Sequence, residues 1–297
     1  MTSGVLNDQR ALLDDYLHRY GQNLSSCAYV NLFAWQDFWQ YDIRLIDDHL
    51  CVFARYPLGV FMILPPLGAR LRGRAVDECF RVMNAVNAES GFSRIDNVGV
   101  DLLSVFFSGG YACYRKGYEY LYYRPDIVGL KGNAYKSKRA DYNYFTRRFR
   151  YRIRPFAEAM TAECGALYDE WAVSRMGDRD DVYRQMLAEN RTVHRLVMRR
   201  ADDLGLVGRV VEVNGRIRAY TFGYPLNRDV FCVLFEIADL SLKGLPVLIF
   251  REFCADRALA PYHFINAMDD VGLRNMTRTK LSFRPRVLLP VYTVTQQ

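Results

Sequence analysis

Apolar residues recur at helical spacing near the start of the chain and at strand-like spacing soon after it. Helices are predicted over residues 9–20, 28–39, 76–89 and 102–108. Strands are predicted over residues 43–46, 50–54, 60–64 and 94–98, and two further strands end at the segment EYLYY, residues 119–123. The strand over 60–64 stops at the turn Pro65-Pro66-Leu67-Gly68. This order of elements is typical of a mixed α/β domain.

The second half begins again with helices, predicted over residues 133–149, 160–174, 180–189 and 191–202. Two strand-like stretches, LVGRVVEV and RIRAYTFGY, then flank Asn214-Gly215, which is a strong hairpin signal. The strand VFCVLFEI precedes a helix from Gly244 to Ala258, and HFIN, a short helix and the strand VLLPVYTV follow. Both halves share this order, and 297 residues exceed the commonest domain size of roughly 100–150. We therefore expect a duplication, with domains at residues 1–130 and 131–297.

The pattern changes within residues 131–154, KGNAYKSKRADYNYFTRRFRYRIR. Up to Phe149, aromatic residues spaced by seven, three and four predict one face of a helix over 133–149. From Arg150 the period is two, because arginines alternate with Tyr151 and Ile153 as on a strand. Nine Lys or Arg and one Asp give this segment +8, against +7 for the whole chain, so the other residues sum to −1. The sequence therefore predicts a concentrated cationic element where the two domains join.

Two interpretations of this segment stay open. In the first, its aromatic face packs across the domain junction and its charges are only solvated. In the second, it binds the phosphates of an RNA or another polyanion. The second interpretation makes substrate-binding candidates of Lys131, Lys136, Lys138, Arg139 and Arg147.

Several other classes have no support in the composition. Seven cysteines occur singly and four histidines are scattered, so neither a disulfide framework nor a metal site is expected. No Gly-x-Ser-x-Gly motif, Walker loop or Rossmann glycine fingerprint occurs. The N-terminus lacks the apolar core of a signal peptide, and no run approaches the roughly 20 apolar residues that span a bilayer. We expect a reduced, cytoplasmic protein without a transmembrane segment, of unknown oligomeric state.

Three longer stretches carry a resemblance to a known family. EYLYYRPDIVGLKGNAYKSKRADYNYF resembles the junction motif of the domain family at the C-terminus of phosphatidylglycerol lysyltransferases, which includes free-standing soluble members (DUF2156). VFCVLFEIADLSLKGLPVLIFREFC and HFINAMDDVGLRNMTRTKLSFRPRVLLPVYTV resemble its later stretches. With NLFAWQDFW and the PPLG turn, the similarity spans nearly the whole chain. It implies two GNAT-like acyltransferase domains in tandem, with the active cleft in the second.

The resemblance also implies a chemistry, the transfer of an aminoacyl group from a charged tRNA to a hydroxyl or amine. Matched positions give Glu236, Asp270 and Lys280 as catalytic candidates and Asp239 and Asn266 as substrate-binding candidates. Glu236 or Asp270 would orient the acceptor or take its proton, and Lys280 would hold a phosphate or the developing negative charge. The alternative is a buried ion pair without catalysis, either Glu236 with Lys280 or Asp270 with an arginine.

The chain departs from the family pattern at two places. Met268 stands where the family usually has Glu, and Asn275-Met276-Thr277 stands where it has Gly-Leu-Arg. Losing a carboxylate and a guanidinium changes the recognition of a cationic aminoacyl group and of a phosphate. We therefore do not expect lysyl transfer to phosphatidylglycerol itself.

A weaker signal concerns coenzyme A. Arg70-Leu71-Arg72-Gly73 fits the Arg/Gln-x-x-Gly-x-Gly/Ala pattern that acetyltransferases use for the pyrophosphate, so Arg70 and Gly73 are candidate cofactor contacts. The matching place before Gly244 lacks the pattern. The leading hypothesis is therefore aminoacyl transfer from aminoacyl-tRNA to a small-molecule or lipid-headgroup acceptor, with no required cofactor. The alternatives are an acyl-CoA-dependent N-acyltransferase and a non-catalytic RNA-binding protein.

Overall fold

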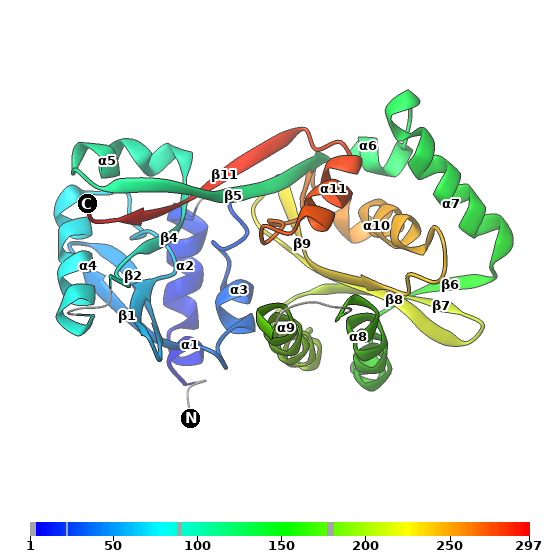
Figure 1. Cartoon of the computed structure of the whole chain (residues 1–297), viewed down its shortest axis with the longest axis horizontal. Coiled ribbons are helices and arrows are strands. Elements are labelled where there is room, and N and C mark those ends of the chain that lie inside the picture. The colour runs from blue at the N-terminus through cyan, green and yellow to red at the C-terminus, as the bar shows by residue number, and fades with distance from the viewer. Residues whose placement is uncertain (1–3, 22, 88–90, 177–180) are drawn as a thin grey trace. The chain divides into compact units, whose positions relative to one another are not determined.

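A computed structural model describes residues 4–21, 23–87, 91–176 and 181–297 (Figure 1). The chain divides into two compact units. Unit 1 contains residues 1–119, 268–276 and 288–297, and unit 2 contains residues 120–267 and 277–287. Strand β5 (Ala112–Tyr123), helix α11 (Arg274–Ser282) and strand β11 (Val287–Thr295) each begin in one unit and end in the other. None of the described helices combines the length and apolarity needed to cross a bilayer.

Unit 1 is a mixed sheet with helices. Its helices are α1 (Gly4–Asp8), α2 (Arg10–Tyr20), α3 (Tyr29–Ala34), α4 (Gly73–Val86) and α5 (Leu103–Ser108). Its other strands are β1 (Gln40–Ile46), β2 (His49–Tyr56), β3 (Gly59–Met62) and β4 (Ile95–Gly99). The strand order is β1-β2-β3-β4-β11-β5, and β3 and β4 run parallel. Phe53, Met62, Phe80 and Phe106 are central to a core that α4 and α5 close against the strands.

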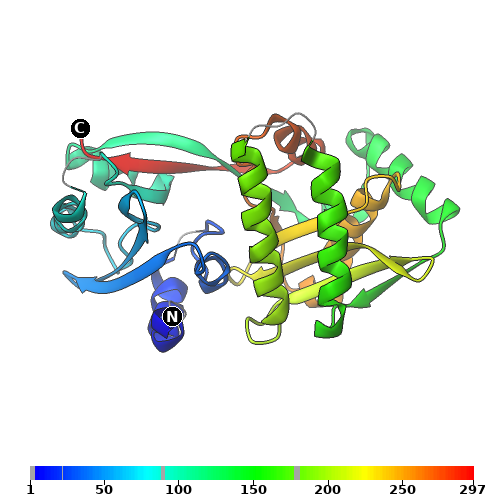
Figure 2. The ribbon, with the colours of Figure 1, turned by 60° about the horizontal axis from the view of Figure 1, so that its bottom comes forward.

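Unit 2 is a sheet with helices on both faces. Its helices are α6 (Arg124–Gly129), α7 (Lys136–Arg148), α8 (Thr161–Met176), α9 (Asp181–Arg199) and α10 (Leu245–Ala255). Its strands are β6 (Tyr151–Pro155), β7 (Val207–Val213), β8 (Arg216–Pro225), β9 (Val230–Ala238) and β10 (Phe264–Asn266), in the order β5-β10-β9-β8-β7-β6. Figure 2 shows α8 and α9 side by side across one face. Helix α10 covers the other face, and α7 packs against α10 (Figure 1).

The two units repeat one succession of elements. In each, an antiparallel meander leads into a helix and then into a strand parallel to the last strand of the meander. In unit 1 these last elements are β3, α4 and β4, and in unit 2 they are β9, α10 and β10. The expected mixed α/β fold is confirmed, and the repeated order is that of a duplication.

The local signals in the second half are confirmed where they are strongest. Asn214 and Gly215 both adopt positive φ, 53° and 77°, which is the backbone of a tight hairpin turn between β7 and β8. Helix α7 ends at Arg148, and β6 pairs with β7 directly after it. The aromatic face of α7, centred on the buried Phe145, packs on α10 within unit 2. The change of period at residue 150 therefore marks a helix that leads into an edge strand.

Five predicted elements differ in number or extent. The two strands expected to end at EYLYY are one strand, β5, which continues through Gly117 without a turn. The two helices expected over 180–189 and 191–202 are one helix, α9, in which the Asn190 side chain bonds the Met186 carbonyl (2.8 Å) instead of breaking the helix. The helix expected over 28–39 ends at Ala34. Residues 88 and 89 of the helix predicted over 76–89, and residue 180 of the helix predicted over 180–189, lie outside the described residues.

Candidate functional site

A β-bulge determines where Glu236 points. Phe222 pairs with Phe235 but Gly223 pairs with Val233, so β9 has one extra residue, Leu234, against β8. Before the bulge, Phe231 and Val233 face α10. After it, the alternation is reversed, and Phe235 and Ile237 face α8 and α9. Glu236 therefore faces the α10 side of the sheet.

The same carboxylate lies beyond the end of a strand pair. Strand β10 pairs with β9 only from Val230 to Cys232, and β9 then continues for six more residues. Glu236 is within that continuation, opposite the buried Thr221 of β8. Thr221 donates its hydroxyl hydrogen bond to the Phe235 carbonyl (3.2 Å), so it does not serve the carboxylate.

Glu236 is a half-buried acid whose Oε2 is closed to solvent and has no hydrogen-bond partner among the described residues. Within the described residues no group donates to this oxygen, which is closed to solvent, and no ion pair of Glu236 is found. Burial raises the pKa of Glu236 from its ordinary value of 4.5 to about 8. The charge of Glu236 in turn raises the pKa of the buried Tyr122 and of the Cys254 thiol, although burial is the larger cause for both. A carboxyl group that titrates near neutrality can both accept and return a proton.

Lys280 is connected through Tyr122 to the surroundings of Glu236. The Tyr122 hydroxyl donates to the Lys280 carbonyl (2.9 Å), and the Lys280 Nζ donates to the Ala267 carbonyl (2.6 Å) and lies 5.5 Å from the Tyr120 ring centroid. The buried Glu236–Lys280 ion pair expected as an alternative does not form. Tyr122 thus bonds the backbone of one predicted catalytic residue and is influenced by the charge of the other, a role that the aromatic composition of EYLYY did not single out.

Asp239 and Asn266 have different surroundings. Asp239 forms an ion pair with Arg218 and accepts hydrogen bonds from the backbone N–H (2.8 Å) and hydroxyl (2.7 Å) of Ser241. These contacts give it a structural task at the turn before α10. Asn266 is fully buried at the end of β10, in register with Leu121 of β5 and Cys232 of β9.

Asp270 belongs to unit 1, whereas Glu236 and Lys280 belong to unit 2. Its Oδ1 accepts a hydrogen bond from the Gly272 N–H (3.0 Å), and its carbonyl accepts one from Leu273 (2.8 Å). The surrounding turn has left-handed backbone at Met268 (φ 58°) and at the β-branched Val271 (φ 50°). Such a conformation is strained for a β-branched residue, and strained turns are common beside functional sites.

The five predicted substrate-binding cations of 131–154 separate into three kinds. Lys131, Lys136 and Arg147 are exposed and have no hydrogen bond or ion pair within the described chain, and we call them the exposed cation set. Arg139 instead donates to the carbonyls of Leu130 and Gly132 and holds the turn before α7. Lys138 is half-buried, with its Nζ 4.0 Å from the Phe283 ring centroid.

Lys138 has a distinct environment. Burial lowers its pKa, the nearby Asp141 opposes that shift, and no carboxylate forms an ion pair with it in the described residues. The Phe283 ring beneath it packs on Phe250 (4.8 Å between centroids) in the same cluster as Tyr122. A cation held over an aromatic face without an anionic partner is suited to receive one from a ligand.

The two helix N-termini that could face an anion differ. At α4, Gly73 is open, Arg70 is exposed, and Arg72 pairs with Asp47 (3.5 Å). At α10, Gly244 (φ 89°) packs directly against the Asp141 carbonyl of α7, and Pro246 removes one N–H from the first turn. Helix α7 therefore occupies the space in which a pyrophosphate would meet the N-terminus of α10. No group of His, Cys, Asp and Glu suited to a metal ion occurs among the described residues.

Comparison with known proteins identifies relatives across the whole chain. A sequence model of the family described as "Phosphatidylglycerol lysyltransferase, C-terminal" matches residues 16–295. A conserved protein of unknown function from Bacteroides thetaiotaomicron has a similar structure, with a TM-score of 0.86, 23% identity, and coverage of 98% of this chain and 97% of that one. No curated protein matches.

Two further solved structures are related more distantly. L-PGS from Bacillus licheniformis has a TM-score of 0.65 and 16% identity, with coverage of 96% of this chain and 91% of that one. A tandem GNAT protein from the clavulanic acid biosynthesis pathway has a TM-score of 0.51 and 10% identity, with coverage of 99% and 96%. These similarities confirm the predicted tandem of GNAT-like folds.

Proposed function

The chain belongs to the phosphatidylglycerol lysyltransferase C-terminal family, and we propose that it transfers an aminoacyl group from aminoacyl-tRNA to an amine or hydroxyl acceptor. Family and fold are those of acyltransferases. The acceptor is a small molecule or a lipid headgroup. The observation that carries the proposal is the carboxyl of Glu236, whose Oε2 is closed to solvent without a partner in the described part of the chain, and whose pKa burial raises to about 8.

Glu236 supplies the proton transfer in this proposal. The acceptor oxygen or nitrogen attacks the ester carbonyl carbon, its proton passes to Glu236, and a tetrahedral oxyanion forms. The bond from that carbon to the terminal ribose oxygen then breaks, and Glu236 returns the proton to the ribose hydroxyl. With a pKa of about 8, about a tenth of the Glu236 carboxyls are ionised at pH 7, and the protonated form is ready for the second step.

Lys280 supplies positive charge beside the reacting ester. Its Nζ is fixed by the Ala267 carbonyl at 2.6 Å, and its backbone is fixed by Tyr122. An ammonium held in this way requires little rearrangement when negative charge develops on the carbonyl oxygen. No cofactor is needed, because the ester of aminoacyl-tRNA is already activated.

The surroundings of α7 favour tRNA over acyl-CoA as the donor. The exposed cation set and Lys138 offer charges that form no ion pair with a carboxylate of the described residues, as a phosphate backbone requires. The covered N-terminus of α10 argues against a coenzyme A pyrophosphate in unit 2. Use of aminoacyl-tRNA also implies a cytoplasmic protein.

The proposal is tested by incubating the protein with tRNA pools charged with radiolabelled amino acids and following deacylation and transfer. We expect at least one pool to be consumed, and we expect Glu236→Gln and Lys280→Met to slow consumption by more than about tenfold. Glu212→Gln is the matched control, because Glu212 is on β7 of the same unit and pairs with Arg154 (2.5 Å) away from the site. Equal rates for Glu236→Gln and the control would refute the assignment.

A non-catalytic RNA-binding function is the second candidate, and the unpaired cations are the observation that favours it. Its distinguishing outcome is retention of tRNA without turnover of any charged pool. Neutralising the exposed cation set would then abolish retention, while Glu236→Gln would leave it unchanged.

A further inference from the structure

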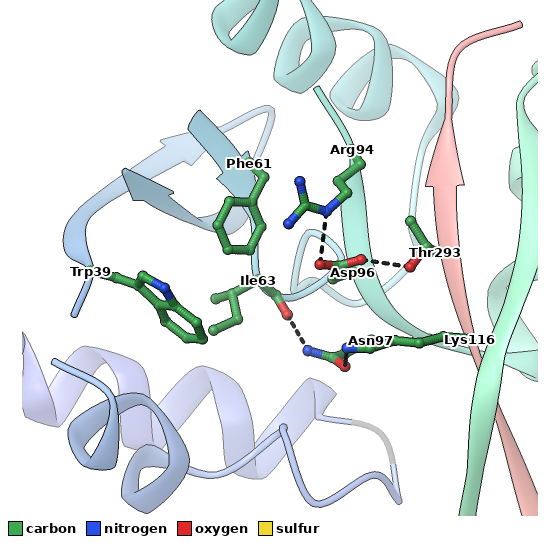
Figure 3. A pocket seen from close by; sticks show the side chains of 8 residues that line it. All are labelled: Trp39, Phe61, Ile63, Arg94, Asp96, Asn97, Lys116 and Thr293. Atoms are coloured by element: carbon green, nitrogen blue, oxygen red, sulfur yellow. Dashed lines mark hydrogen bonds and ion pairs between the residues drawn. The ribbon is translucent and has the colours of Figure 1, made fainter. Parts of the chain in front are cut away.

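Unit 1 contains a cavity of about 470 Å³ at the place where its parallel strands part (Figure 3). Strands β3 and β4 pair only at Met62 and Ile95. Beyond that pair, the Asn97 side chain donates to the Ile63 carbonyl (2.9 Å) and so replaces the missing bond of the strand ladder. Asn97 has left-handed backbone (φ 57°), which turns β4 away from β3. The cavity is therefore built into the strand geometry.

One wall of the cavity is aromatic. Figure 3 shows Trp39, Phe61 and Ile63 along this side. The Trp39 ring stacks on Trp35 (5.7 Å between centroids) and meets Phe61 edge to face (5.8 Å). Phe61 is 5% exposed, so this wall is held rigidly by the core. A flat apolar group is the natural partner of such a wall.

Beside this wall lies an arginine that the protein holds in place. The Arg94 guanidinium lies between the Phe61 and Phe92 rings, 4.2 and 4.5 Å from their centroids. Its Nε donates to Asp96 (3.0 Å), and the other Asp96 oxygen accepts from the Thr293 hydroxyl (2.6 Å). The one carboxylate of the lining is thereby satisfied and neutralised before any ligand arrives.

Lys116 leaves the lining with a net positive charge. Its exposed Nζ donates to the Asn97 Oδ1 (3.3 Å), which uses one of its three hydrogens and directs the ammonium to the cavity. The lining therefore has two cations, Arg94 and Lys116, against the single anion Asp96. A lining of charge +1 suits a monoanion. A nucleotide or other multiply charged phosphate would be left with unpaired charge, and the ammonium of a free amino acid would find Asp96 already engaged.

We propose that this cavity binds a small aromatic carboxylate, with its ring against Trp39, which Phe61 supports from the core, and its carboxylate on Lys116. Its volume is within the range of small-molecule sites, roughly 300–1,000 Å³. All of the lining residues belong to unit 1, and none has a part in the proposed transfer chemistry. The proposal therefore stands independently of the proposed function.

The test is calorimetric titration of the full chain with 2-naphthoate and with 2-naphthamide, its neutral analogue. We expect the carboxylate to bind at least about tenfold more tightly than the amide, because a charge-assisted hydrogen bond is lost with the amide. Lys116→Met should weaken naphthoate binding by about tenfold or more and leave the amide unchanged. Trp39→Leu should weaken both ligands.

Arg115→Met is the matched control, since Arg115 is adjacent on β5, carries the same charge and packs on Tyr118 (4.9 Å) instead of lining the cavity. It should bind naphthoate within about twofold of the unaltered protein. Lys116 and Arg115 are both exposed, so neither change threatens folding. Absence of naphthoate binding at millimolar concentration, equal binding of acid and amide, or equal effects of the Lys116 and Arg115 changes would each overturn the proposal.

Discussion

Replacing Glu236 by Gln should stabilise the protein while it slows transfer by more than about tenfold. Burial raises the pKa of this carboxyl from 4.5 to about 8, so the folded protein holds a proton near neutral pH that the unfolded chain releases. Because the pKa is higher in the folded state, the protonated carboxyl makes its full contribution to the free energy of unfolding below pH 4.5, and this contribution is lost as the pH rises to 8. At about 1.4 kcal/mol per pH unit, the loss amounts to about 3 kcal/mol at pH 7 and less than about 1 kcal/mol near pH 5.

Glutamine removes this titration but keeps the shape of the side chain. Its amide and the protonated carboxyl leave the same oxygen position without a partner, so that cost cancels in the comparison. Urea unfolding near pH 5, 7 and 8.5 measures the effect. We expect Glu236→Gln to gain little near pH 5 and about 3 kcal/mol at pH 7, whereas Glu212→Gln follows the unaltered protein at every pH. A Glu236→Gln variant that is destabilised equally at all three values would refute the reasoning, because its carboxyl would then have a stabilising partner.

Three further outcomes follow from other residues. Burial lowers the pKa of His194 to about 3. The free energy of unfolding should therefore fall as the pH drops from about 6.5 towards 3, by about 3 kcal/mol at pH 4. The His194→Gln variant should lose much less free energy of unfolding in the same urea titration. Neutralising the exposed cation set should lower the slope of log affinity for tRNA against log salt by about 2–3. Arg216→Gln, at the exposed hairpin, is the control and should lower the slope by no more than about 1. Equal slopes for the two variants would contradict phosphate binding by the exposed cation set. Gly244→Ala should lower the free energy of unfolding by at least about 2 kcal/mol. Gly132→Ala should lower it less, since both glycines have positive φ but only Gly244 meets the Asp141 carbonyl. Equal losses in thermal unfolding would show that α7 does not pack against the N-terminus of α10.

The sequence predicts the parts of the fold that depend on local chemistry. Asn214-Gly215 requires positive φ at two successive residues, and the alternation after Arg150 requires an exposed and a covered strand face. The extents of β5 and α9 are less predictable, because Gly117 and Asn190 are compatible with both an interruption and a continuous element. Only tertiary contacts decide between the two. The placement of β11 beside β4 likewise depends on pairing between residues nearly 200 positions apart.

The site shows the same division. Glu236 can be singled out from sequence because a carboxylate in an apolar strand is costly. The bulge at Leu234 that directs it towards α10 cannot, since VFCVLFEI has no glycine or proline to mark an irregular pairing. Arg139 and Lys138 are adjacent and equally basic in the sequence. The structure gives one of them two backbone carbonyls and leaves the other over an aromatic ring.

The two units give an acidic side chain opposite electrostatic surroundings, although on non-equivalent strands, β4 in unit 1 and β9 in unit 2. In each, a carboxylate lies near the point where a parallel strand pair ends, Asp96 in unit 1 and Glu236 in unit 2. Asp96 is satisfied by Arg94 and Thr293, which leaves it inert and its cavity suited to holding a ligand. Glu236 has no such partners, so its folded state carries a cost that a purely structural residue would not retain. If the duplicated fold divides binding from chemistry, that division lies in these partners. An arginine introduced beside Glu236 should therefore stabilise unit 2 and stop proton transfer, which unfolding and transfer assays on one variant can measure together.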